Sequence, residues 1–313
     1  MIWLLTTLQQ GLLFLATMIL IGCVTWHTLI GRKALATLKD CAEEFDAAAS
    51  LVVRWARLSS GALIAAWIMR MTAQILAFRD PFAPLRDDIS LLLFQTVWGT
   101  IWMIQGAVIL LIAVVLTWGV SSEDLSRSSR SMRMTSTWSM LVFLVLALIL
   151  TLAMSGHAMG TGAWRWASVT ADALHTLAAG AWLGSLAVIL GVSRRAFDGA
   201  ERAPPAFSAQ VHRFSPIALA SGGTVVTMGI VLSWTHLTSI SDLWTTNYGL
   251  ILSSKIFVVI LILGLGFWNW RRGVPTSDQV AGMRTIQRRG SWEVGLAAGV
   301  ILLTAILVHS AKP

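Results

Sequence analysis

The chain has 313 residues, of which 56% are hydrophobic and only 12% are charged, and its mean hydropathy is +0.73. Soluble domains carry about 25% charged residues, so this composition excludes an ordinary soluble protein. The net charge of +8 would suggest a nucleic-acid partner in a soluble protein. Here the basic residues stand between apolar runs, so we expect them to orient the chain in a lipid membrane and expect no nucleic acid as partner.

Eight apolar runs are long enough to cross a bilayer, which takes about 20 residues in a helix. They lie near 11–30, 58–78, 89–120, 138–155, 167–192, 217–235, 249–270 and 292–308. The third run is too long for the hydrocarbon core, so it either tilts or projects into water at one end. We therefore predict an all-α, polytopic membrane bundle of about eight helices, with three spans in residues 1–136 and five in residues 137–313.

Lysine and arginine are distributed unevenly between the two sides of the predicted bundle. The connections after the first, third, fifth and seventh spans carry 17 of these residues, and the opposite side carries 4. Cytoplasmic connections are the ones enriched in basic residues. The sequence therefore predicts a multi-pass protein of the bacterial inner membrane with both termini in the periplasm.

The same topology gathers four of the six histidines on the outer side. His157 ends the fourth span, His236 the sixth and His309 the eighth, while His175 lies about 8 residues into the fifth, roughly 12 Å deep. Each alone would be read as an interfacial histidine bonded to a backbone carbonyl. As a group they favour a functional site, because functional polar groups gather on the inner faces of membrane bundles.

Two further residue types accompany these histidines. Met154 and Met159 flank His157, and thioethers together with imidazole suit soft ions, Cu(I) above all. Methionine also fills gaps in apolar helices, which is the alternative interpretation. Asp172 stands three residues before His175 on the same helical face. Its carboxylate is expected either to accept the imidazole N–H, as at many metal sites, or to stabilise the start of its helix.

On the inner side, Cys23 and His27 are spaced i, i+4, which places a thiol and an imidazole on one face of the first span. They could bind a soft ion that leaves the bundle, or they could simply pack there. Lys255 lies within the seventh span and is expected to reach water or to pair with Asp172. Glu293 is expected to open the eighth span, where an acid suits a helix N-terminus.

Several of these residues belong to longer motifs. The motifs are Ser155-Gly156-His157-Ala158, Asp172-Ala-Leu-His175 through Trp182-Leu-Gly184, Asn247-Tyr248-Gly249 through Lys255 with Asn269, and Arg288-Arg-Gly-Ser-Trp-Glu293. From about Trp138 to the end, the sequence resembles the copper-resistance protein D family of bacterial inner-membrane copper proteins. It departs from that family at Leu250, where a basic residue is frequent. The resemblance implies copper movement from periplasm to cytoplasm, often beside a periplasmic copper-binding partner.

Three functions remain open at this point. The first is copper transport, with the outer histidines and methionines as capture site and Cys23 with His27 as exit; no P-loop is present to bind ATP, and we expect no enzyme activity. The second is electron transfer through a b-type haem, with His175 and His236 as axial ligands from different helices. The third is a membrane scaffold that holds a periplasmic copper chaperone.

Overall fold

The computed structural model describes residues 2–35, 42–82, 84–119, 131–156, 162–196 and 203–310, and in this part of the chain the regular elements are all helical. The longer α-helices are α1 (Ile2–Thr25), α3 (Ala42–Phe78), α4 (Leu85–Phe94), α5 (Val97–Trp118), α6 (Ser131–Met154), α7 (Arg165–Ala179), α8 (Ser185–Arg195), α9 (Ala203–His236), α11 (Asn247–Trp268) and α12 (Val280–Leu307). The shorter elements used below are the π-helical turns η1 (Trp26–Gly31), η6 (Gly180–Gly184) and η7 (Asn269–Gly273), and the helices α2 (Arg32–Leu35) and α10 (Asp242–Thr245). Eight helical segments of the described residues are long and apolar enough to cross a membrane, which confirms the predicted all-α polytopic bundle.

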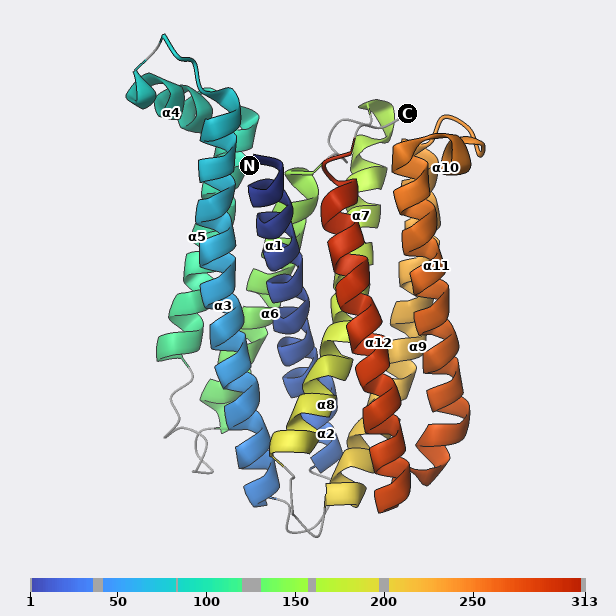
Figure 1. Cartoon of the computed structure of the whole chain (residues 1–313). Coiled ribbons are helices and arrows are strands. Elements are labelled where there is room, and N and C mark those ends of the chain that lie inside the picture. The colour runs from blue at the N-terminus through green and yellow to red at the C-terminus, as the bar shows by residue number, and fades with distance from the viewer. Residues whose placement is uncertain are drawn as a thin grey trace.

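Successive spans alternate in direction, so the first and last described residues lie at the same end of the bundle (Figure 1). We call this end, with Ile2 and Ser310, the terminal end. The opposite end, which we call the basic end, carries Arg32, Arg194 and Arg271 near the ends of their spans.

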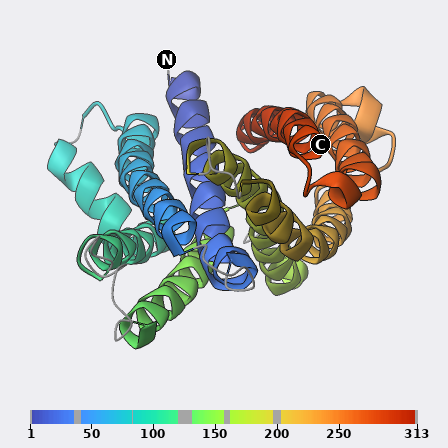
Figure 2. The same cartoon turned by 90° about the horizontal axis from the view of Figure 1, so that it is seen from below.

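Helix α1 runs through the middle of the bundle (Figure 2). It packs against α3 on one side and against η6, α8 and α12 on the other. One continuous cluster of buried apolar side chains reaches all eight spans. Its members include Leu20, Leu63, Ile109, Leu148, Val188, Val225, Ile262 and Ala297. The described spans therefore pack together around the first one.

The contact between α1 and η6 brings two backbones together. A methyl group at Gly22 would lie 2.3 Å from the carbonyl carbon of Gly184, and one at Gly184 would lie 2.1 Å from the carbonyl oxygen of Met18. A methyl at Gly180 would lie 2.6 Å from Ile21 Cδ1. Gly180 and Gly184 thus form the small-residue spacing through which membrane helices approach closely.

The long third run is two helices rather than one tilted span. Thr96 has an extended backbone and its Oγ1 accepts a hydrogen bond from Gly99 N at 2.9 Å, so it caps the start of α5. The residues before this cap form α4, which lies outside the spans at the terminal end (Figure 1). Hydropathy could not locate the break, because a single threonine hardly changes the apolar average.

Several helices begin well before the apolar runs indicated, and α9 and α12 are two examples. Helix α9 begins at Ala203, because Pro204 and Pro205 occupy its first turn, where the missing N–H groups of proline are tolerated. Helix α12 begins at Val280, so Glu293 lies midway along it. The expectation that Glu293 opens the eighth helix is therefore wrong. The first turns of α12 are polar and basic, and their sequence indicated a connection instead of a helix.

The turn between α9 and α11 is held by Asp242, which is 9% exposed. Its carboxylate accepts hydrogen bonds from Ser239 N at 2.8 Å and from Thr238 N and Oγ1 at 2.9 and 2.8 Å. These bonds, that of Ser239 N foremost, hold the pKa of Asp242 below its usual value because they favour the charged form. Their stabilisation is present above the ordinary aspartate pKa and is lost as the pH falls through the lowered value.

Candidate functional site

His175 lies in α7, on the terminal-end half of its span, and is half-buried. Its Nδ1 lies 3.0 Å from the carbonyl oxygen of Val225 in α9. A carbonyl oxygen only accepts hydrogen bonds, so Nδ1 carries the proton and Nε2 keeps its lone pair. The structure thus fixes the tautomer in which Nε2 can bind a metal ion.

A glycine in α9 makes room for this imidazole. Gly229 stands one turn after Val225, and a methyl group there would lie 3.4 Å from His175 Cε1 and 3.7 Å from Nδ1. A larger side chain at position 229 would occupy the space of the ring. The close approach of α7 to α9 therefore depends on a residue without a side chain at this point.

Two charged residues share the surroundings of His175. Asp172 on α7 and Lys255 on α11 are both half-buried, and Lys255 is close enough to interact electrostatically with Asp172 and with His175. Within the described part of the chain, the ion pair with an N–O distance below 4.0 Å joins Arg79 and Asp88, so Asp172 and Lys255 interact over a longer distance. The imidazole N–H donates to the Val225 carbonyl, whereas the sequence suggested Asp172 as its acceptor.

The other residues predicted as outer ligands are spread over the terminal end. Met154 ends α6 and packs against the small buried cluster of Ala153 and Val169. His236 ends α9, with Nδ1 3.1 Å from Thr235 Oγ1, and His309 follows α12 and is exposed. Among the residues that the structure describes, no three of His, Cys, Asp and Glu stand together as a metal-binding group.

Two predicted ligands, His157 and Met159, lie outside the described residues. They belong to the connection between α6 and α7, directly after Met154. They therefore stay predictions, as does the complete ligand set at His175.

His236 does not face His175 across the bundle. Val225, whose carbonyl contacts His175, and His236 are both on α9 and are 11 residues apart, which is about 16 Å along a helix. The two axial histidines of a haem approach the same iron from opposite sides. His175 and His236 therefore lie at different depths in the bundle, which does not fit the pair of axial haem ligands that the sequence suggested.

Sequence reasoning missed the role of Arg70, whose position inside the second span could have signalled it. Its guanidinium group donates to Gln105 Oε1 at 3.3 Å, and to the Oγ and carbonyl oxygen of Ser155 at 3.0 and 3.2 Å. It also lies 5.8 Å from the ring centre of Trp98. Arg70 thus joins α3 and α5 to the residue that precedes the His157 connection.

Cys23 and His27 lie deep in the basic-end half of α1 and η1. Cys23 is fully buried and His27 is 4% exposed. The imidazole stacks on the indole of Trp138 in α6, with ring centres 3.9 Å apart and planes 9° apart. Packing between helices therefore occupies one face of the imidazole, and the exit role of this pair stays a prediction.

A second buried polar group, also missed, lies among α11, η7 and α12. The Asn269 side-chain amide donates to Glu293 Oε1, and the two residues are 8% and 3% exposed. The signal that could have found this pair is an acid and an amide inside segments that cross the membrane.

The chain matches two family descriptions. Residues 208–307 match "Copper resistance protein D", and residues 1–166 match "Copper resistance protein D-like, N-terminal domain". A curated relative, the copper transport protein CutJ of Bacillus subtilis (strain 168), is 26% identical over 318 aligned residues, which cover 97% of this chain and 52% of CutJ. The chain thus spans about half the length of this relative. No solved structure matches the present chain.

Proposed function

Since the chain belongs to the copper resistance protein D family, we propose that it moves copper ions across the bacterial inner membrane from the periplasm to the cytoplasm. The family, the copper transport relative and the eight spans support a multi-pass membrane protein that handles copper. The observation that carries the transport proposal is the imidazole of His175. It is held inside the bundle in the tautomer that leaves Nε2 as a ligand.

In this proposal His175 is the inner ligand of a capture site at the terminal end. Met154, His157 and Met159 supply further ligands from the connection beside α7, and His236 and His309 take copper at the surface. Asp172 sets the charge around the ion together with Lys255. Thioether and imidazole ligands suit Cu(I). Cys23 and His27 would receive the ion in the basic-end half.

A periplasmic copper-binding protein is the partner that we propose to deliver the ion. The terminal end presents the exposed His309 and the surroundings of His236, which could accept copper from such a donor. A donor protein lowers the need for free copper ions, which are scarce and reactive. The membrane lipid around the spans is the other partner.

The orientation is tested with reporters fused within the chain. A reporter at Ala200 should be active in the cytoplasm, and one at Pro313 in the periplasm, because basic residues gather at the end of the bundle that holds the connection containing Ala200. The two reporters should give opposite signals in the same host. The reverse pattern would place the histidines on the cytoplasmic side and overturn the proposed direction.

Transport itself is tested with the purified chain in lipid vesicles. Vesicles that contain the protein should take up copper faster than empty vesicles, and uptake should saturate as the outer copper concentration rises. Uptake equal to that of empty vesicles would reject transport. If those vesicles still bound a periplasmic copper-binding protein, the scaffold function would replace transport as the proposed function.

A further inference from the structure

Glu293, which pairs with Asn269, is the most buried acidic side chain of the described residues, and the proposed copper path does not use it. Glu293 lies midway along α12, and its Oε1 accepts a hydrogen bond from the Asn269 amide. Its Oε2 faces Gly266 of α11, where a methyl group would lie 3.5 Å away. The indole of Trp182 also lies beside Gly266, at 3.8 Å from the same methyl position.

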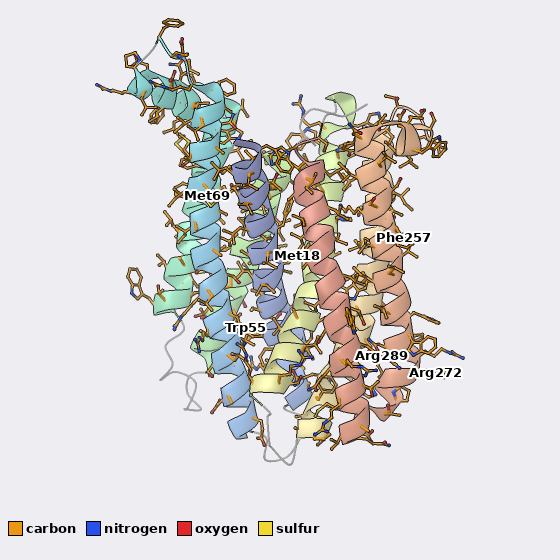
Figure 3. The ribbon with its side chains drawn as sticks, in the orientation of Figure 1. Met18, Trp55, Met69, Phe257, Arg272 and Arg289 are labelled. Carbon is orange, nitrogen blue, oxygen red and sulfur yellow. The ribbon has the colours of Figure 1, made fainter. Side chains whose placement is uncertain are left out.

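Several charged groups on neighbouring elements make contacts elsewhere. On α8, Arg194 donates to Gln287 O and Ser291 Oγ, and Arg195 lies over the Trp55 ring. Arg272 of η7 and Arg289 of α12 lie 5.2 and 5.9 Å from the ring centre of Trp268, and Figure 3 shows both near the basic end of α11 and α12.

The other elements packed on α12 likewise bring no cationic group within 4.0 Å of Glu293 among the described residues. On α9, the imidazole of His212 bonds to Ser208. Helix α1 and η6 carry no charged residue. Within the described residues, the carboxyl group therefore has an amide as its partner and no cationic side chain within 4.0 Å.

The amide itself gives a second, independent observation. Asn269 Oδ1 is a buried acceptor to which no described group donates. An isolated carboxylate inside a membrane bundle is costly, and so is an unpaired buried acceptor. A proton on Glu293 removes the charge and supplies a donor for the amide oxygen, since a carboxylic acid and a carboxamide can form two reciprocal hydrogen bonds.

We propose that Glu293 and Asn269 form a proton-binding site inside the membrane, and that copper passing through the bundle exchanges with this proton. The exchange part rests on the proposed copper transport. The step balances as a carboxylic acid and a copper cation giving a carboxylate–copper pair and one released proton. In this proposal the two carboxylate oxygens and Asn269 Oδ1 receive the arriving ion.

The position of the pair fits an exchange with the capture site. Lys255 and Asn269 are 14 residues apart on α11 and η7, about 21 Å along the axis, and Gly266 lies on the same helical face. The residues around His175 and the pair of Glu293 and Asn269 therefore form two polar sites at different depths on one side of α11. The copper path then includes α11 and α12 beside the α1 residues Cys23 and His27.

The proton site is tested with dicyclohexylcarbodiimide, an apolar reagent that modifies protonated carboxyl groups within membranes. Mass spectrometry of the wild-type protein should find the adduct on Glu293, in an amount that falls as the pH rises and falls when copper is added. Glu293→Gln should lose this adduct. Asp278→Asn, which changes an exposed acid at the basic end, should leave it unchanged. No adduct on Glu293 at any pH, or an amount independent of pH, would overturn the proton site.

The exchange is tested in vesicles that contain a pH-sensitive dye. Wild-type protein should move protons when copper is added, and Glu293→Gln, which keeps the size of the side chain, should abolish this proton signal while copper binding at the outer site stays at the wild-type level. Proton movement that is equal in the two proteins would overturn the exchange. If the wild type moved no copper, the proposed function would fail, and the labelling result would still decide the proton site.

Discussion

Replacing His175 with alanine is expected to abolish high-affinity copper binding to the purified protein. The imidazole is held by the Val225 carbonyl with Nε2 available, and the low dielectric of the bundle strengthens the bond between a ligand and an ion. Asp172→Asn removes a charge without changing size. We expect it to weaken binding by about 10- to 100-fold, as is usual for residues that act through a metal ligand. Copper titration of each purified variant measures both effects.

Matched variants separate a lost ligand from a disturbed fold. His212→Ala should bind copper like the wild type, because His212 lies near the basic end of α9. Gly229→Val should displace the imidazole and weaken binding, whereas Gly223→Val on the same helix, where a methyl group meets nothing within 4 Å, should not. Equal affinity in the wild type and in His175→Ala would show that the histidines form no metal site.

Gly184→Ala is expected to destabilise the bundle strongly. The added carbon would lie 2.1 Å from the Met18 carbonyl oxygen, so α1 and η6 would have to separate. Overpacking costs typically about 1–3 kcal/mol, and we expect the upper end because the obstacle is backbone, which has no other rotamer. The midpoint of thermal unfolding in detergent, followed by tryptophan fluorescence, measures the effect.

Gly295→Ala is the control for this substitution. A methyl group at Gly295 meets nothing within 4 Å, and alanine is favoured over glycine within a helix by about 1 kcal/mol. This variant should therefore unfold at the wild-type temperature or slightly above it. A Gly184→Ala protein as stable as the wild type would show that α1 and η6 do not touch as described.

The number and type of spans could be predicted from the sequence, because about 20 apolar residues in a row leave the backbone of a membrane segment no alternative to a helix. Helix ends were harder to predict. Thr96 divides an apolar run by one hydrogen bond, and Val280 begins a helix whose first turns are polar. Hydropathy averages respond to neither feature.

The candidate site could be predicted only in part, for a related reason. Sequence spacing places His175 and Asp172 on one face of a helix, but the Val225 carbonyl that holds the ring belongs to a backbone 50 residues away. The link from Arg70 to Ser155 and the pairing of Asn269 with Glu293 also join different helices. Such contacts follow from how the helices pack, which the pattern of a single segment does not contain.

The contact between Gly22 and Gly184 has a consequence for how the protein is made. The two residues are 162 positions apart in the chain, which corresponds to roughly 8–30 s of synthesis at common rates of about 5–20 residues per second. During that interval the first span is already in the membrane and its α3 partner follows early, but its glycine face has no partner. A nascent chain that stops before η6 is inserted therefore exposes that face of α1 to lipid or to the insertion machinery.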